Sequence, residues 1–201
     1  MNKNISLFGA GGHAKVIMDI LRSCGVTVSE IYDDNPDVNE LSGVPVLHNE
    51  PKSPLIISIG NNHIRKKIAD KLSGVSYGRA IARSAVVSHS AIVDLGSVVM
   101  QGAVIQASVK IGMHSIINTG ATIDHDCVIH GFVHIAPGCN LCGNVEVGEG
   151  TLVGAGTIII PGVKVGKWSI IGAGSVIRKD IPDNVIAVGN PCKIYKKLRD
   201  E

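Results

Sequence analysis

The hydrophobic residues of this chain follow two different patterns. In the longer stretch, residues 81–182, a hydrophobic residue recurs every six positions. The residue two places before each repeat start is usually small or β-branched. The fourth position is often Gly or Asn, which adopt a left-handed backbone conformation at little cost. Seventeen hexads in phase begin with a branched aliphatic residue: Ile81, Val87, Val93, Val99, Ile105, Ile111, Ile117, Ile123, Ile129, Ile135, Leu141, Val147, Val153, Ile159, Val165, Ile171 and Ile177.

A period of six matches neither an α-helix nor an isolated alternating strand. It fits short strands wound around a three-sided prism, with successive coils paired as β-strands about 4.8 Å apart. We therefore predict an all-β parallel β-helix over residues 81–182. Residues 183–201 are expected to form a C-terminal tail that caps the helix.

Residues 1–80 instead alternate buried strands with amphipathic helices. Strands are predicted at 5–8, 28–32 and 55–59, with helices after the first and third. We assign these elements to an α/β domain of the βαβαβ type, equal to half of a doubly wound, Rossmann-like sheet. A dinucleotide fold needs two such halves, so a nucleotide or nucleotide-sugar is favoured over NAD.

Candidate ligands for the nucleotide gather where these strands end. A glycine-rich turn at a helix start can bind pyrophosphate through its amides, and an acidic residue about 20 positions later can hold a ribose hydroxyl. A glycine turn that merely joins a strand to a helix is the alternative. The candidates are Gly9, Gly11, Gly12, His13, Asp33, Asp34, Gly60 and Asn61.

Charge and composition limit the kinds of molecule that this protein is expected to bind. The net charge of +2 is too small to favour nucleic acid or an anionic membrane. No apolar run approaches the roughly 20 residues that span a bilayer, and the start lacks a signal peptide's apolar core. A cytoplasmic protein is expected, in agreement with an odd number of cysteines.

Cys139 and Cys142 could suggest zinc or redox chemistry. The hexad register places Cys139 at an inward position and the two side chains on opposite sides of the wall. We therefore expect packing, and no metal site.

His125 is the strongest candidate for a catalytic base. It occupies the third position of its hexad, within Asp124-His125-Asp126, and Gly143 lies eighteen residues later, one coil higher on the same edge. An imidazole beside an unshielded backbone N–H supplies the base and the oxyanion donor that acyl transfer needs. Asp126 is expected to orient His125 or raise its pKa. A surface histidine on a turn is the alternative.

Outward positions of the predicted prism form three columns, and two of them are mostly apolar. The first is Val98, Ile116, His134, Leu152 and Ile170. Such a patch predicts contact with another subunit, with His134 in an apolar seam. Two apolar faces and one charged face suit a homotrimer. His114, His130, His48 and His89 are expected at the solvated surface.

Several segments together resemble a known family: FGAGGHAKV, IYDD, IGNNHIRKKI, NTGATIDHDCVI and VGNPCK. They resemble the sialic-acid O-acetyltransferase group of hexapeptide-repeat sugar acyltransferases. Within it, the nearest resemblance is to acetyl-CoA-dependent N-acetyltransferases of the bacillosamine and perosamine type, which modify nucleotide-linked 4-amino-4,6-dideoxy sugars. The resemblance covers nearly the whole chain and implies a left-handed β-helix and a homotrimer with active sites between subunits.

The resemblance also implies roles for single residues. The catalytic histidine of the family falls at His125, and related sequences often have Glu where Asp126 stands, which leaves a direct contact open. His134 and Asn118 would position the acetyl thioester or the acceptor amine. Coenzyme A would follow small side chains toward a basic C-terminal end, and its expected contacts are Gly143, Ala155, Ala173, Lys179 and Lys193.

The expected function is N-acetylation of a nucleotide-linked amino-dideoxy sugar, with UDP as the expected nucleotide and acetyl-CoA as co-substrate. One alternative is O-acetylation of a sialic acid or another sugar hydroxyl. The other is a nucleotide-sugar-binding trimer without catalysis. The sequence leaves the nucleotide and the sugar open.

Overall fold

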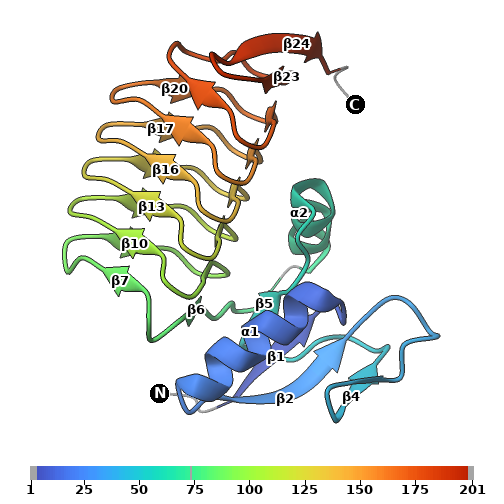
Figure 1. Cartoon of the computed structure of the whole chain (residues 1–201). Coiled ribbons are helices and arrows are strands. Elements are labelled where there is room, and N and C mark those ends of the chain that lie inside the picture. Colours follow the sequence, from blue (N-terminus) through green and yellow to red (C-terminus); the bar gives the residue numbers. More distant parts are fainter. Residues whose placement is uncertain (1–3, 73, 199–201) are drawn as a thin grey trace.

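The computed structural model describes residues 4–72 and 74–198. Figure 1 shows an N-terminal α/β layer at the base of a tall stack of coils, with helix α2 lying between the two. Neither helix of the described residues is long and apolar enough to cross a membrane.

The N-terminal part confirms the predicted half of a doubly wound sheet, but two short strands stand where the predicted βαβαβ order has its second helix. Its elements are β1 (Asn4–Phe8), α1 (Gly12–Ser23), β2 (Thr27–Tyr32), β3 (Glu40–Leu41), β4 (Val44–Leu47), β5 (Leu55–Ile57) and α2 (Asn62–Lys71). The sheet order is β3-β4-β2-β1-β5, and all neighbours are parallel except β3 and β4. The carboxyl ends of β1, β2 and β5 therefore meet at one edge, where ligands bind in such sheets.

The hexads form the predicted parallel β-helix, with a two-residue strand in each repeat. The first nine strands are β6 (Ala80–Ile81), β7 (Val86–Val87), β8 (Ile92–Val93), β9 (Val98–Val99), β10 (Val104–Ile105), β11 (Lys110–Ile111), β12 (Ile116–Ile117), β13 (Thr122–Ile123) and β14 (Val128–Ile129). The next eight are β15 (His134–Ile135), β16 (Asn140–Leu141), β17 (Glu146–Val147), β18 (Leu152–Val153), β19 (Ile158–Ile159), β20 (Lys164–Val165), β21 (Ile170–Ile171) and β22 (Val176–Ile177).

Three sheets make the three faces of the prism, which we name after their first strands. The β6 face is β6-β9-β12-β15-β18-β21, the β7 face is β7-β10-β13-β16-β19-β22, and the β8 face is β8-β11-β14-β17-β20. Each strand pairs in parallel with the strand eighteen residues away, as His134 does with Ile116 and Leu152. Stacking of residues one coil apart, on which the site prediction depends, is therefore confirmed.

The corners follow the predicted backbone conformation. The fourth hexad position has a positive φ in every hexad from Gly96 to Gly174, whether or not it is glycine. The residues other than glycine are Ser108, His114, Asp126, Phe132, Asn144 and Trp168.

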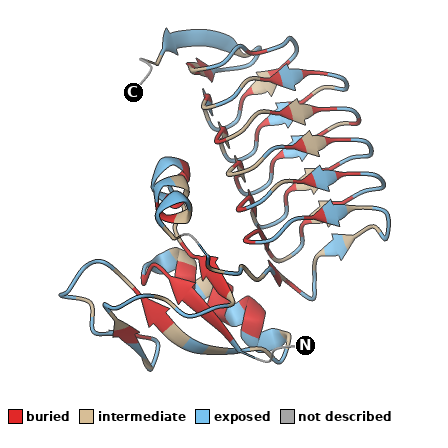
Figure 2. Cartoon of the chain, turned by 180° about the vertical axis from the view of Figure 1, so that it is seen from behind, coloured by how far each residue is buried: buried red, intermediate tan, exposed pale blue. Residues whose placement is uncertain are grey.

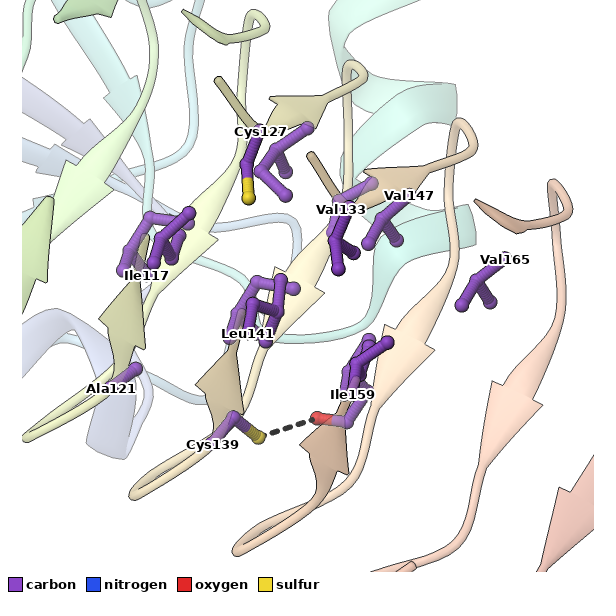
Figure 3. Close-up of a cluster of buried hydrophobic side chains, with 14 of the residues drawn as sticks. Ile117, Ala121, Cys127, Val133, Cys139, Leu141, Val147, Ile159 and Val165 are labelled. Atoms are coloured by element: carbon purple, nitrogen blue, oxygen red, sulfur yellow. Dashed lines mark hydrogen bonds between the residues drawn. The ribbon is translucent and has the colours of Figure 1, made fainter. Parts of the chain in front are cut away.

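The inside of the coils is a continuous apolar core. Figure 3 shows side chains such as Ile117, Leu141 and Ile159 packed within it, and Leu141 and Ile159 lie in register in neighbouring coils. Cys139 is fully buried there, and its thiol donates to the Val153 carbonyl at 3.6 Å, which confirms the packing interpretation of this cysteine.

The top of the helix is closed by the C-terminal segment. Strand β23 (Val185–Val188) pairs in parallel with β21, and β24 (Lys193–Lys197) pairs antiparallel with β23. Val185 and Ala187 complete the core. Strand β24 is exposed along its whole length, as its pale blue colour in Figure 2 shows.

One prediction about the β6 face is wrong in its lower half. Val98 and Ile116 are each 1% exposed, because the N-terminal domain of the same chain, not another subunit, covers them. Higher on this face Leu152 is half-buried and Ile170 is exposed. Only the upper half of the column is therefore free for another subunit.

Candidate active site

The corner between the β7 and β8 faces holds the first cluster of candidate residues. The His125 Nδ1 atom lies 2.8 Å from the Asp126 Oδ2 atom, so the shorter aspartate does reach the imidazole. The Asp124 carboxylate accepts a hydrogen bond from the His125 backbone N–H at 2.8 Å. Both side chains of the His125–Asp126 pair are about half exposed, open to a substrate.

This arrangement gives His125 the character of a base. The hydrogen bond that His125 Nδ1–H donates to Asp126 raises the pKa of His125 above its ordinary value of 6.5, and the nearby Asp124 charge adds to the effect. A carboxylate on Nδ1 also fixes the tautomer, because it holds the proton there and leaves Nε2 free to accept another.

Gly143 lies directly above the imidazole, as the repeat predicts. A Cβ atom at this position would lie 2.6 Å from His125 Cε1 and 2.7 Å from Nε2, so only glycine leaves room for the ring. The Asn144 N–H donates to the His125 carbonyl at 2.9 Å, which ties the two corners together. Gly143 itself is buried, so it is less open than the sequence suggested. In the described part of the chain its N–H donates to no other group.

The second cluster lies on the β6 face. The Asn118 Nδ2 atom lies 3.1 Å from His134 Nε2. The amide orientation is fixed because the Thr119 N–H donates to Asn118 Oδ1 at 2.8 Å. His134 Nε2 must therefore be the acceptor, and a neutral His134 carries its proton on Nδ1.

Burial and a nearby cation keep His134 neutral. Burial lowers the pKa of His134 to about 4, the positive charge of Arg65 acts in the same direction, and a hydrogen bond to the Gly60 backbone opposes them. His134 is therefore suited to orienting a ligand as a neutral group, whereas His125 is suited to removing a proton.

His13 brings the glycine turn to this cluster. Burial lowers the pKa of His13 to about 4, and the charges of His134 and Arg65 contribute because both lie close. Its Nε2 atom is buried and has no hydrogen-bond partner among the described residues. The turn before α1 and the β6 face therefore meet within one chain.

The glycines of the turn have different uses. Gly9 has a φ of +111°, and a Cβ atom there would lie 2.6 Å from Ile59, so this glycine is required by the fold. Nothing lies within 4 Å of a Cβ atom at Gly11 or Gly12, which leaves open space for a ligand. Helix α1 has no side-chain cap, so the amides of its first turn remain available to an anion.

Other predicted nucleotide contacts already have partners in the fold. Asp33 accepts hydrogen bonds from the Ala10 N–H at 2.7 Å and the Asn35 N–H at 2.9 Å. Asn61 caps α2 by accepting from the Ile64 N–H at 3.0 Å. Asp34 is exposed and has no hydrogen-bond partner among the described residues. It is the carboxylate left free at this edge.

The predicted coenzyme A contacts lie on two different corners. Gly143 belongs to the corner between the β7 and β8 faces, and Lys179 lies two residues after the end of β22 of the β7 face. Ala155 and Ala173 are exposed at the corner between the β6 and β7 faces. Lys193 is exposed on β24. One chain therefore separates these residues by the whole β7 face.

The sequence missed three features of this region. His114 is 2% exposed, so the prediction of a solvated residue is wrong: its ring packs between Tyr77 and Phe132. Arg65 is 1% exposed, and its position on the same side of α2 as Ile68 was the signal that could have revealed it. A cavity of about 340 Å³ lies between the start of α2 and the β6 face, lined by residues that include His63, His134, Leu152 and Trp168.

The two histidine clusters do not meet in one chain. His125 lies on the corner between the β7 and β8 faces, and His134 lies on the β6 face. In a three-sided prism that corner is opposite the β6 face. A reaction that uses both clusters therefore needs a second copy of the chain.

Comparisons with known proteins account for both parts of the chain. Residues 4–72 match the PglD N-terminal domain, and residues 144–179 match the bacterial transferase hexapeptide family of six repeats. Two curated relatives match locally. UDP-N-acetylbacillosamine N-acetyltransferase of Bacillus subtilis is 39% identical over 103 residues, and an uncharacterised Acanthamoeba polyphaga mimivirus protein is 32% identical over 94. The chain spans 48% and 19% of their respective lengths.

Solved structures match over nearly the full length. A mutant of perosamine N-acetyltransferase from Caulobacter crescentus, in complex with CoA and GDP-perosamine, is 41% identical, with 96% of this chain and 97% of that chain covered and a TM-score of 0.93. The acetyltransferase domain of PglB from Neisseria gonorrhoeae, in complex with acetyl coenzyme A, is 37% identical over 96% of this chain and 100% of that one, with a TM-score of 0.89. The chain therefore belongs to the hexapeptide-repeat sugar N-acetyltransferases that carry a PglD N-terminal domain.

Proposed function

We propose that this protein transfers the acetyl group of acetyl-CoA to the 4-amino group of a nucleotide-linked 4-amino-4,6-dideoxy sugar. The observation that carries the proposal is the stacking of Gly143 on His125 one coil below, with Asp126 hydrogen-bonded to the imidazole. It supplies a base and a backbone donor side by side, as acyl transfer requires.

In the proposed reaction, His125 Nε2 accepts a proton from the amine as the nitrogen forms its bond to the acetyl carbonyl carbon. The Gly143 N–H donates to the oxygen that becomes negative. The carbon–sulfur bond then breaks, and the imidazolium returns its proton to the departing thiolate. Asp126 stabilises the imidazolium between these steps, which agrees with the raised pKa of His125.

For the acceptor we propose the edge where the N-terminal sheet meets the β6 face. The open space at Gly11 and Gly12 and the uncapped start of α1 suit a pyrophosphate. The exposed Asp34 carboxylate suits a ribose hydroxyl, and His13, Asn118 and His134 are placed to contact the sugar. Gly9, Asp33, Gly60 and Asn61 support this edge through the contacts described above.

We also propose a homotrimer, because one chain holds its two histidine clusters on opposite sides of the prism. Exposed aliphatic residues on the β7 face, Val86 and Ile158, and Ile170 on the β6 face are available for a neighbour. Coenzyme A would then lie between subunits, which could unite Gly143 and Lys179 of one chain with Ala155 and Ala173 of another. A phosphate contact by Lys193 and a cytoplasmic location stay predictions.

The test is release of CoA thiol from acetyl-CoA in the presence of UDP-linked and GDP-linked 4-amino-4,6-dideoxy sugars and of a sialic acid. We expect turnover with an amino sugar and an acetylated product stable to alkali, as an amide is. An alkali-labile product would indicate O-acetylation, and no thiol release with any acceptor would support a binding protein without catalysis. UDP is the nucleotide expected from the sequence, and the GDP arm tests it.

A further inference from the structure

Arg65 is a buried cation that has no acidic partner among the residues that the structure describes. It lies on α2 and is 1% exposed, yet all of its hydrogen bonds to described residues go to neutral oxygens. Its Nε atom donates to the His114 carbonyl at 2.7 Å, and Nη1 donates to the carbonyls of Ile59 at 2.9 Å and Gly60 at 3.2 Å. Its Nη2 atom donates to Asn62 Oδ1 at 2.8 Å and to the Phe132 carbonyl at 2.9 Å.

These five bonds join the two halves of the molecule. Ile59, Gly60 and Asn62 belong to the N-terminal domain, whereas His114 and Phe132 are corners of the β-helix with positive φ. Asn62 completes the connection, because its Nδ2 atom donates to the Gly150 carbonyl at 2.9 Å. A planar guanidinium can serve several fixed acceptors at once, which the single ammonium of lysine cannot reproduce.

The residues held by Arg65 border the acceptor edge. The Gly60 backbone is hydrogen-bonded to His134, and the Asn118 amide holds the other side of that ring. The charge of Arg65 also acts on His13 and His134, the two imidazoles at this edge. Arg65, His13, Gly60 and Asn118 thus surround His134, and His63 lines the same cavity as His134.

We propose that Arg65 is a positioning residue for the acceptor. It holds the Gly60 turn and the glycine turn before α1 in a fixed position relative to the Asn118–His134 pair. The proposal rests on the proposed function for its substrate, but not for the state of His134. Arg65 contacts no reacting atom. Its effect is to give the sugar site a fixed geometry and to add its charge to the burial that keeps His134 neutral.

The test compares Arg65→Met, Arg65→Lys and a matched control, Lys67→Met, which removes a positive charge from an exposed position of the same helix. We expect Arg65→Met to raise the acceptor KM about tenfold or more, the effect of at least one lost charge-assisted hydrogen bond. The KM for acetyl-CoA should stay within about twofold of the wild-type value. An equal rise in both KM values would instead indicate damage to the whole fold. Lys67→Met should match the wild type.

A second measurement is independent of turnover. In an NMR titration of the histidine rings, removing the positive charge in Arg65→Met should raise the pH at which His134 takes up a proton. Arg65→Lys should restore most of this titration while leaving the acceptor KM high, because it restores charge without the planar fork. If Arg65→Met does not fold, Asn62→Ala loosens the same connection and should raise the acceptor KM by a smaller factor.

Equal changes in both KM values, or an unchanged acceptor KM together with an unchanged His134 titration, would overturn the proposal. Failure of the wild type to acetylate any acceptor would instead refute the proposed function, and the titration would still test the role of Arg65.

Discussion

Four histidines of this chain fall into two electrostatic classes that suit different tasks. Acidic neighbours raise the pKa of the exposed His125, whereas burial lowers the pKa of His13, His114 and His134 to about 4. Environments that separate the pKa values of like groups commonly mark a division of roles. His125 is thus placed to exchange protons, whereas these three buried histidines stay neutral at ordinary pH.

Asp126→Asn tests the origin of the basic character of His125. Because the carboxylate raises the pKa of His125, its removal should lower that pKa toward 6.5. The base must be neutral to act, so the acidic limb of the kcat profile should move to lower pH. At neutral pH we expect kcat to fall about 10-fold to 100-fold, since a weaker base is less effective.

The measurement is kcat against pH with both substrates saturating. A profile with an unshifted acidic limb would show that Asp126 does not set the pKa of the catalytic group. Asp180→Asn is a suitable control, because it also neutralises an exposed carboxylate but lies near the top of the helix.

For single residues, the sequence predicted the positions that follow from the six-residue repeat. It did not predict the burial that results from packing between the two domains. His125 and Gly143 are eighteen residues apart, so their stacking follows from the period alone. His114 also occupies a corner, but the N-terminal domain covers it through Tyr77, a contact that no periodicity describes. Arg65 was missed because its partners come from both domains, although its spacing from Ile68 on α2 pointed to a buried position.

Among the elements, the turn from β1 to α1 combines structural glycines with glycines that leave space. Gly9 has a positive φ and no room for a side chain, whereas Gly12 begins the helix with open space beside it. Within four residues, Gly9 is therefore required by the fold, and Gly12 leaves space for a ligand.

Gly9→Ala should lower the free energy of unfolding by about 1–3 kcal/mol, since it adds a strained conformation and a clash with Ile59. Gly12→Ala should leave stability unchanged or raise it by up to about 1 kcal/mol, because alanine favours the helix. It should nevertheless weaken nucleotide-sugar binding, because its methyl group fills the space proposed for phosphate.

Urea denaturation measures the free energy of unfolding, and calorimetry measures the affinity for the nucleotide-sugar. If Gly12→Ala bound the acceptor as tightly as the wild type, the phosphate position at this turn would be wrong.

The order of elements was predictable from hydrophobic periodicity, whereas the sense of winding was not. The six-residue repeat specifies strands, corners and core, but general chain chirality favours right-handed parallel crossovers. The expected left-handed sense comes from family resemblance alone. Strand β5 ends at Ile57, two residues earlier than predicted, because the chain turns there toward the cap of α2.

For the whole molecule, the separation of the two clusters has a direct consequence for assembly. Each chain places His125 opposite its own β6 face, so a site that uses His125 and His134 must combine two subunits. The N-terminal domain already covers the lower β6 face, which restricts a neighbour on this face to its upper coils.

Subunit mixing tests this arrangement. His125→Ala and His134→Ala should each lose most activity alone, and trimers assembled from both should regain part of it, because some sites receive an intact residue from each subunit. Two preparations of His125→Ala mixed in the same way are the control. No recovery in verified mixed trimers would mean that the two residues act from the same chain or in different steps.

The most direct test of the account is the turnover number of His125→Ala with acetyl-CoA and the preferred amino sugar nucleotide, both saturating. We predict that kcat falls about 100-fold to 10,000-fold, the usual contribution of a positioned general base, with little change in either KM. A kcat close to that of the wild type would contradict the assignment of His125 as the base and, with it, the reaction proposed at this corner.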